Sequence, residues 1–437
     1  MHKNRSGPLA ALLIGSLSIP LPALAAPSDI TAIREVALKD DVAYEFTEGL
    51  TTEVGPRPAG TPQEARARDW AVARLKALGF ANVRAEPYTM PVWVRGREEA
   101  RILSPFPQNL VLAALGNSGS TSEKGIEGEI VYFPSIADLE AAPEAAVKGR
   151  IAFVDHGMTA TQDGSSYGYF GAARRQGPSI ASKKGAIAIL IRSIGTDHHR
   201  VAHTGVQMWG EGAKPIPAAA LSVPDAEQLA RVVKRGQPVR VALTLTSKML
   251  KDQPSGNVIA EIPGSDPAAG VVVAACHLDS WDQGTGAIDD ATGCGIAAAS
   301  ALEVAKAGQP RRTIRVLMAG AEEVGGDGAR AYFAAHGAER HALALESDFG
   351  ADRVWRVDFK LPAGHEALAT RIKQALAPLG VGSGTQQAGG GADIAPLVKA
   401  GVPVIDLQQD GTRYFDLHHT PDDTLDKVDL AQLRQNV

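Results

Sequence analysis

Five side chains of the kind that bind metal ions fall in order through the second half of the chain, each at the end of a predicted strand or in the loop after one. They are His277, Asp289, Glu323, Asp348 and His419. Loops that follow the buried strands of an open α/β sheet gather along one edge, where such sheets bind ligands. Two imidazoles and three carboxylates suit divalent ions of zinc type. The sequence therefore predicts a site for two zinc ions per chain.

The second half of the chain alternates between apolar runs and helical patterns. The apolar runs are continuous, which is typical of strands buried on both faces of a sheet. Predicted strands cover residues 257–262, 271–276, 313–318, 342–346 and 404–407, and predicted helices cover residues 291–307, 326–335, 365–379 and 394–400. This order indicates an α/β fold in which helices flank the sheet.

The first half of the chain contains two segments with different residue patterns. In the first segment, helices are predicted at residues 29–38, 41–54 and 62–78, and a strand at residues 82–88. In the second segment, short β-branched runs predict strands at residues 128–133, 150–154, 186–191 and 239–245. Helices are predicted between these strands at residues 179–184 and 225–235. We therefore expect a first α/β part over residues 26–114, an inserted β-rich domain over residues 115–250, and a second α/β part over residues 251–437 that carries the metal site.

Residues 1–25 have the features of a secretory signal peptide. Lys3 and Arg5 precede an apolar run over residues 9–24, and a small residue, Ala25, ends the segment. The run is shorter than the ~20 residues that a membrane span needs. We expect a mature chain that is secreted or periplasmic and has no membrane segment.

Length and charge narrow the class of protein further. A chain of 437 residues is longer than one hydrophobic core usually supports, so more than one domain is expected. The formal net charge is −5, and no basic stripe indicates a nucleic-acid partner.

The chain has two cysteines, Cys276 at the end of a predicted strand and Cys294 in a predicted helix. Both positions are apolar, so we expect two buried thiols. An oxidising compartment would also permit a disulfide, but this is the less favoured interpretation.

Acidic neighbours of the predicted ligands suggest supporting roles. Asp279 lies two residues after His277, where its carboxylate can accept the second imidazole N–H and so orient the ring. Asp289 has two oxygens with which to bridge two ions. Asp290 competes with it as a ligand, but it directly precedes a predicted helix and is assigned to the helix N-cap or to support of the ligands.

The pair Glu322 and Glu323 indicates a division of labour, because successive side chains of an extended backbone point apart. We assign Glu323 to the metal ions. Glu322 would act as general base, taking a proton from a water held by the metals and passing it to a leaving amine. Two solvated loop acids are the alternative.

Two residues near the last ligand are candidates for contact with an oxyanion. His418 would donate a hydrogen bond to a tetrahedral intermediate, or it is a surface histidine. Tyr414 has the same two interpretations.

At these residues the chain resembles the co-catalytic di-zinc exopeptidases, and within them the plasma glutamate carboxypeptidase group, also called carboxypeptidase Q. The likeness covers nearly the whole mature chain. The matching segments are residues 55–61 (GPRPAGT), 277–282 (HLDSWD), 286–290 (GAIDD), 321–323 (AEE), 346–348 (ESD) and 418–420 (HHT).

The resemblance implies a phosphorylase/hydrolase-like mixed sheet flanked by helices, with an inserted protease-associated domain. It also implies two zinc ions bound by the five ligands, Glu322 as general base, hydrolysis of dipeptides or short peptides, and a homodimer. Three arginines, Arg57, Arg353 and Arg413, are candidates to anchor a substrate carboxylate. Acids near the metals would instead anchor an amine, as in an aminopeptidase, and the sequence leaves this choice open.

Two further interpretations compete with the exopeptidase. A glutaminyl cyclase shares the fold but works with a single zinc ion, and the bridging Asp289 together with the Glu322 and Glu323 pair argues against it. A non-catalytic peptide-binding protein would be expected to have lost a ligand or the base, and none is missing here.

Overall fold

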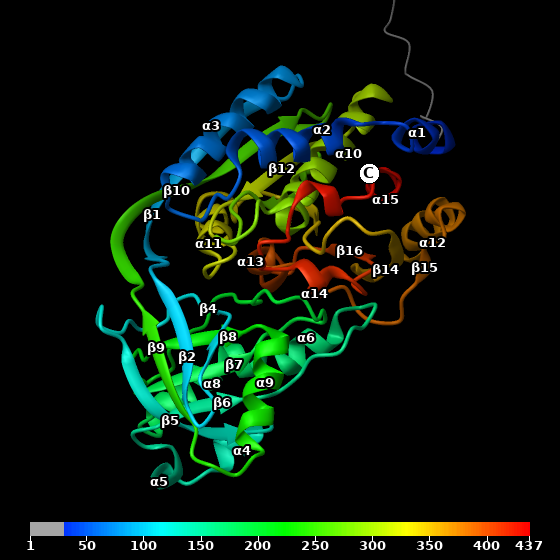
Figure 1. Cartoon of the computed structure of the whole chain (residues 1–437). Coiled ribbons are helices and arrows are strands. Elements are labelled where there is room, and N and C mark those ends of the chain that lie inside the picture. Colours follow the sequence, from blue (N-terminus) through cyan, green and yellow to red (C-terminus); the bar gives the residue numbers. More distant parts are fainter. Residues whose placement is uncertain (1–29) are drawn as a thin grey trace, which may run out of the picture.

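The computed structural model describes residues 30–437, so the predicted signal peptide lies outside the described part of the chain. Figure 1 shows two parts: one is built around a large sheet with helices on both sides, and the other around a second sheet. Within residues 30–437, no helix has the length and apolar character required to cross a membrane.

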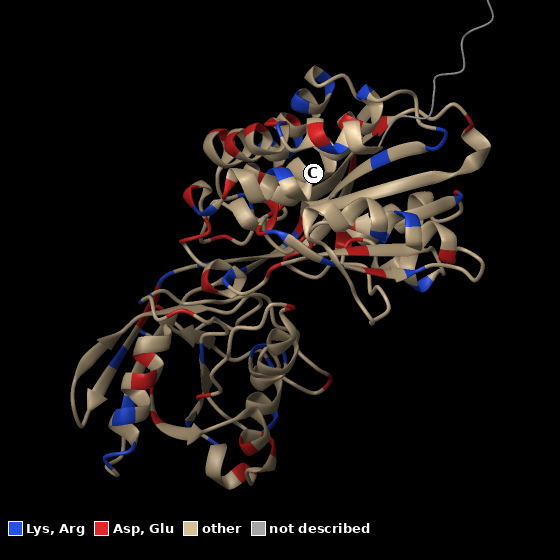
Figure 2. Ribbon diagram, turned by 90° about the vertical axis from the view of Figure 1, so that its right-hand side faces the viewer, with Lys and Arg blue, Asp and Glu red and all other residues tan. Residues whose placement is uncertain are grey.

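Charged residues are distributed over both parts of the molecule. Lysines and arginines, as well as aspartates and glutamates, occur along the ribbon of each part (Figure 2).

The first sheet is mixed and has eight strands. Their spatial order is β1 (Ala81–Val94), β10 (Lys248–Ile262), β12 (Thr313–Ala319), β11 (Val271–His277), β13 (His341–Glu346), β16 (Val404–Gln409), β14 (Val354–Lys360) and β15 (Gly382–Ser383). The four central strands from β12 to β16 run parallel, whereas β10 and β14 pair antiparallel with their inner neighbours. The polypeptide therefore leaves the central strands at one edge of the sheet.

Helices cover both faces of this sheet. One face packs against α2 (Val42–Gly49), α3 (Pro62–Ala77) and α10 (Thr292–Lys306), and the other packs against α11 (Asp327–His336) and α13 (Ala395–Lys399). Three more helices lie around these elements: α1 (Ile30–Ala37), α12 (Glu366–Leu376) and α15 (Leu430–Asn436). The prediction of an α/β fold with helices flanking the sheet is confirmed.

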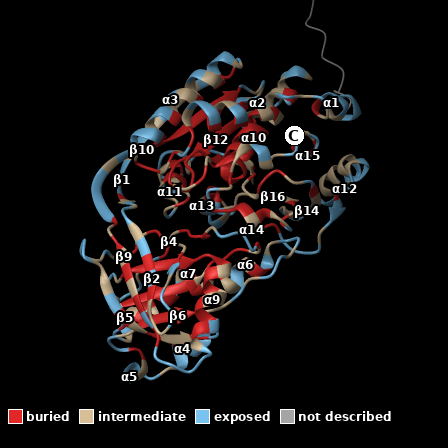
Figure 3. Cartoon of the chain, viewed as in Figure 1, coloured by how far each residue is buried: buried red, intermediate tan, exposed pale blue. Residues whose placement is uncertain are grey.

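The second sheet is built from residues between 98 and 245. Its strands are β3 (Gln108–Leu110), β2 (Glu98–Ser104), β9 (Arg240–Leu245), β5 (Ile126–Phe133), β6 (Ile151–Val154), β7 (Ala188–Arg192), β8 (Ala218–Leu221) and β4 (Leu112–Ala114) in spatial order. The helices of this part are α4 (Ile136–Ala141), α5 (Glu144–Val147), α6 (Ser165–Phe170), α7 (Ala172–Arg175), α8 (Gly177–Lys183) and α9 (Val223–Val233). This sheet has its own buried cores, visible beside those of the first sheet in Figure 3.

Two long strands connect the parts. The chain leaves the first sheet along β1 and returns along β10, and the two strands pair with each other from Ala81 opposite Glu261 to Val94 opposite Lys248. The crossing is thus a hydrogen-bonded ribbon (Figure 1). A paired ribbon is stiffer than two independent linkers, so it restricts how the second sheet lies against the first.

The two cysteines form a disulfide, so the expectation of two free thiols is wrong. Cys276 lies on β11 and Cys294 on α10, and both are fully buried in the core between this strand and helix. Because α10 packs directly on β11, the two Cα atoms are only 5.1 Å apart, which is within the range that a disulfide spans. The sequence alone does not reveal this proximity.

Replacing both cysteines, Cys276→Ala with Cys294→Ala, should lower the free energy of unfolding by about 3 kcal/mol, because the bond closes a loop of sequence separation 18. Thermal and urea unfolding of both proteins in chelator would measure this without stabilisation by bound metal. Two free thiols in the denatured, unreduced wild-type protein would contradict the disulfide.

Candidate metal centre

The predicted ligands meet at the edge of the first sheet where its parallel strands end. His277 is the last residue of β11, Glu323 lies in the loop after β12, and Asp348 lies two residues after β13. Asp289 occupies the turn before α10, and His419 follows the short helix α14 (Tyr414–Leu417). His277 is fully buried, and Asp289, Glu323 and His419 are each less than a tenth exposed.

Asp289 lies between two imidazoles. Its Oδ1 is 3.0 Å from Nε2 of His277, and its Oδ2 is 3.4 Å from Nε2 of His419. Each oxygen therefore faces a different histidine. This is the arrangement expected of a carboxylate that bridges two metal ions.

The remaining acids divide between the two histidines. Glu323 Oε2 is 2.6 Å from Nε2 of His419, and Asp348 Oδ1 is 3.5 Å from Nε2 of His277. Possible ligand atoms of His277, Glu322 and Asp348 also lie within 4.8 Å of one another. Asp289 therefore belongs both to a group of side chains around His277 and to a group around His419. Glu322 lies beside the group around His277.

Burial and like charges shift the ionisation of this cluster. Burial raises the pKa of Glu322 well above its usual value, and the charges of Asp348 and Glu323 raise it further against the lowering effect of His277. For Asp289 burial also raises the pKa, but hydrogen bonds with His277 and His419 outweigh it and leave the pKa well below its usual value.

The cluster fits divalent cations. Several carboxylates share one buried cleft, and Glu323 Oε1 lies there without a hydrogen-bond partner. A buried acceptor of this kind is uncommon in proteins unless water or an ion satisfies it. Imidazole nitrogens and carboxylate oxygens form the donor set that zinc prefers. His277, Asp289, Glu323, Asp348 and His419 are the residues that would hold the ions.

Asp279 supports the site by a contact different from the expected one. The backbone carbonyl of Asp279, and not its carboxylate, lies at 2.9 Å from Nδ1 of His277, while carboxylate Oδ1 is 3.7 Å away. That oxygen accepts a hydrogen bond from the backbone N–H of Glu322 at 3.2 Å. Burial raises the pKa of Asp279 to about 7. The residue thereby links the His277 loop to the loop of the predicted base.

Asp290 connects the start of α10 to His277. Its Oδ1 accepts from the backbone N–H of Gly293 at 3.1 Å, and its Oδ2 accepts from the backbone N–H of His277 at 3.1 Å. The side chain thus satisfies a free N–H at the start of the helix and holds the backbone of a ligand. Asp290 lies one residue before the N-cap position of α10, which Ala291 occupies, so the sequence placed the start of the helix one residue too early.

Arg57 belongs to the turn of residues 55–61, and it holds the loops of the site together. It is fully buried, and its guanidinium donates to the carbonyl oxygens of Leu278, Thr285 and Gly286 at 2.5, 2.6 and 2.9 Å. Burial lowers the pKa of Arg57 despite nearby acids such as Asp423. With all its strong contacts directed to backbone oxygens, Arg57 is not placed to anchor a substrate.

Sequence analysis did not single out Asp423, which holds the Asp289 loop from the other side. Its Oδ1 accepts from the backbone N–H groups of Ala287 and Ile288 at 2.8 Å each. Burial and the charge of Asp289 raise the pKa of Asp423 to about 7. The only sequence signal was its position four residues after His419.

A cavity of about 290 Å³ opens beside the predicted ligands. Glu322, His418 and Tyr414 line it, as the sequence analysis allowed. The His418 ring stacks on that of His419 with centroids 3.6 Å apart, and its Nδ1 is buried without a partner. Burial lowers the pKa of His418 well below its usual value, which favours a neutral ring.

The second sheet's part contributes to the same cavity through Arg174 and Tyr167. Arg174 is 5% exposed; its guanidinium donates to Thr204 O at 2.6 Å and to the Tyr167 hydroxyl, and its Nε–H has no partner. Thr204 O is also 3.3 Å from Nδ1 of His419. Nothing in the local sequence distinguished Arg174 from other arginines.

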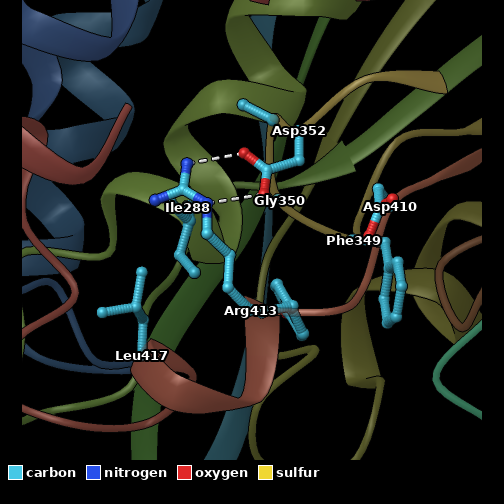
Figure 4. Close-up of a pocket in the computed structure, with 9 residues that line it drawn as sticks. Ile288, Phe349, Gly350, Asp352, Asp410, Arg413 and Leu417 are labelled. Carbon is cyan, nitrogen blue, oxygen red and sulfur yellow. Dashed lines mark hydrogen bonds and ion pairs between the residues drawn. The ribbon is translucent and has the colours of Figure 1, made fainter. Parts of the chain in front are cut away.

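The other arginine candidates are engaged elsewhere. Arg413 forms a two-pronged ion pair with Asp352, both N–O distances being 2.6 Å, and Figure 4 shows it directed at this carboxylate. Arg353 donates to Leu379 O at 3.0 Å. Neither of the two lines the cavity at the ligands.

Comparison with known proteins identifies the family. Residues 257–437 match the model described as "Peptidase family M28". Carboxypeptidase Q from Bos taurus is 33% identical over 395 residues, which cover 90% of this chain and 82% of that protein. The chain belongs to peptidase family M28. Carboxypeptidase Q from Homo sapiens is 33% identical over 394 residues with the same coverage.

Solved structures agree with this assignment. A peptidase M28 precursor from Shewanella amazonensis is 44% identical to this M28 peptidase, with a TM-score of 0.91 and 93% of each chain covered. A zinc aminopeptidase from Bacillus subtilis shares the fold at 22% identity, with a TM-score of 0.64 over 90% of this chain and 92% of that one. The predicted resemblance and the prediction of a metallo-exopeptidase are confirmed.

Asp289→Asn should reduce zinc binding strongly, because the substitution removes the charge of the one carboxylate that faces both histidines. We expect the zinc content after dialysis against a zinc buffer, measured by elemental analysis, to fall to less than half of the wild-type content. Asp266→Asn, on a surface aspartate paired with Arg311, should keep the wild-type content. Equal zinc affinity in both variants would contradict the bridging role.

Proposed function

We propose that this M28 peptidase is a zinc-dependent exopeptidase that hydrolyses dipeptides or short peptides with two zinc ions per chain. The observation that carries the proposal is Asp289, whose two oxygens face His277 and His419 separately. Glu323 and Asp348 would complete the two binding sites. When bound, the ions would supply a polarised carbonyl and an activated water.

Glu322 is proposed as the general base. It lies in the cavity beside His277 and Asp348, and its backbone is held by Asp279. Its carboxylate would accept the proton of the attacking water and deliver it to the leaving amine. Its raised pKa makes this carboxylate a better proton acceptor.

His418 is proposed to stabilise the oxyanion of the tetrahedral intermediate. Its ring lines the cavity and is favoured in the neutral form, so one ring nitrogen carries a hydrogen to donate. A hydrogen-bond donor held in place before the reaction stabilises charge that develops in the transition state. His203 holds the His418 backbone, since its Nδ1 lies 3.0 Å from the His418 carbonyl oxygen.

Arg174 supports a preference for peptides with a free carboxyl terminus. The enzyme would then be a carboxypeptidase or dipeptidase and not an aminopeptidase. It is the arginine that lines the cavity, and its Nε–H lacks a partner. A planar guanidinium matches the geometry of a carboxylate. Bound there, the carboxyl terminus of a short peptide would lie beside the metal ligands, as a carboxypeptidase or dipeptidase requires.

Other properties of the proposed enzyme rest on its resemblance to carboxypeptidase Q. They are secretion after removal of residues 1–25, an inserted protease-associated domain over residues 115–250, and a homodimer. In support of the insertion, residues 98–245 form a separate sheet with its own cores.

Glu322→Gln tests the base. The variant should bind zinc as the wild type does and lose about 10²- to 10⁴-fold in kcat on dipeptides, because the amide cannot accept the proton. Dipeptide hydrolysis and zinc content should be measured on the same preparations. If wild type and variant both bind zinc and neither hydrolyses dipeptides, the chain is a peptide-binding protein and not an enzyme.

Arg174→Met tests the carboxylate anchor with a side chain of similar length. For Ala-Leu, kcat/KM should fall about 10- to 100-fold, the value of a hydrogen-bonded charge pair, whereas the C-terminal amide of Ala-Leu should be little affected. Arg175→Met is the control, since Arg175 donates to Gly168 O and is outside the cavity lining. An amide cleaved as fast as the acid, with N-acetylated peptide resistant, would favour an aminopeptidase.

A further inference from the structure

A second cavity, of about 110 Å³, adjoins the metal centre. Glu323 lines this cavity and also the larger one that contains Glu322 and Arg174. Trp93 and Val94 at the end of β1, Trp281 in the loop after His277, and Val324 supply walls from the first part of the molecule. Gly116 and Asn117 supply walls from the second part. A group that entered the second cavity would therefore lie next to a proposed metal ligand.

The charged groups in this cavity are already paired. Arg95 lies 2.7 Å from Asp282 Oδ2 and 2.5 Å from Glu98 Oε1, and burial, which lowers its pKa, is outweighed by these acids. The guanidinium carbon also lies 5.1 Å from the centre of the Trp93 ring. Among the charged residues that line the cavity, Glu323 has one oxygen, Oε1, without a partner, while its Oε2 lies 2.6 Å from His419.

Aromatic and aliphatic side chains supply most of the other walls. Trp281 is buried and stacks on the ring of His419 with centroids 4.8 Å apart, so one wall is attached to the metal centre. Its indole Nε1–H has no hydrogen-bond partner. Gly116 approaches the same ring so closely that a Cβ atom there would lie 2.8 Å from it. Because Gly116 has no Cβ atom, there is room for the indole ring of Trp281 at this position.

We propose that this second cavity is the subsite for one substrate side chain and that it selects an uncharged, apolar one such as leucine. This inference rests on the proposed function, because it takes the metal centre as the place where the peptide bond is cleaved. The volume is several times the ~30 Å³ that a water molecule occupies, so it suits a side chain and is too small for a folded partner. Burial of an apolar side chain between Trp93, Trp281 and Val324 would supply the selectivity.

Hydrolysis of two dipeptide series tests the subsite. In wild type, kcat/KM should be at least about tenfold higher for Leu than for Gly at one of the two positions, and lower again for Asp, in Ala-X or X-Ala. Val94→Phe should fill the cavity and abolish the preference for Leu. Val324→Ala should enlarge it and raise the ratio of Phe to Leu.

Val304→Phe is the matched control, because Val304 is 37% exposed on α10 and Val94 is 36% exposed at the cavity. The control should keep the wild-type ratios. Ratios between substrates are insensitive to any general loss of activity in a variant. The inference is overturned if Leu, Gly and Asp peptides are cleaved equally, or if Val94→Phe leaves the ratios unchanged.

Binding separates this inference from the proposed function. Zinc-loaded Glu322→Gln should bind the preferred Leu dipeptide at least about tenfold more tightly than its Gly analogue in calorimetry, and adding Val94→Phe should remove the difference. If no dipeptide is hydrolysed by wild type but this difference is found, the proposed function fails, and the cavity is a binding pocket for an apolar side chain of a peptide that is not cleaved. If Gly dipeptides are hydrolysed but no difference is found, only the subsite fails.

Discussion

The position of Asp289 between His277 and His419 is the constraint on which the rest of the centre depends. A carboxylate buried this deeply needs compensating charge, and it must also be held still. Arg57 and Asp423 provide the second condition, since they bind the backbone on either side of the loop before Asp289. Divalent cations would provide the first. The many backbone contacts around the site thus serve to place one carboxylate.

The cleft is a product of both sheets. The parallel strands of the first sheet bring the ligands to one edge, while the part around the second sheet contributes Arg174 and the Thr204 carbonyl next to His419. The paired strands β1 and β10 restrict the position of the second part. The predicted metal ligands thus come from the first part of the chain, whereas Arg174, the proposed carboxylate anchor, comes from the second part.

Strands were predictable where their residues are buried on both faces. The central strands β11 and β12 are buried over most of their length and were found within a residue or two. In contrast, β14 near the edge of the sheet was missed because polar residues such as Arg356 and Asp358 interrupt it. Strand β1 extends past its predicted end through Pro91, which an edge strand tolerates because it has a free side.

The sequence by itself determined the α/β fold and indicated the five candidate metal ligands, because buried strands and the polar residues in the loops between elements leave local patterns in the chain. It also predicted different roles for Glu322 and Glu323, which both line the cavity at the metal centre. Only the tertiary structure decided that Cys276 meets Cys294 and that Arg174, instead of Arg413, reaches the cleft. These contacts depend on how α10 packs on β11 and how the second part lies against the first. Such packing joins residues far apart in the chain and leaves no local signal in the sequence.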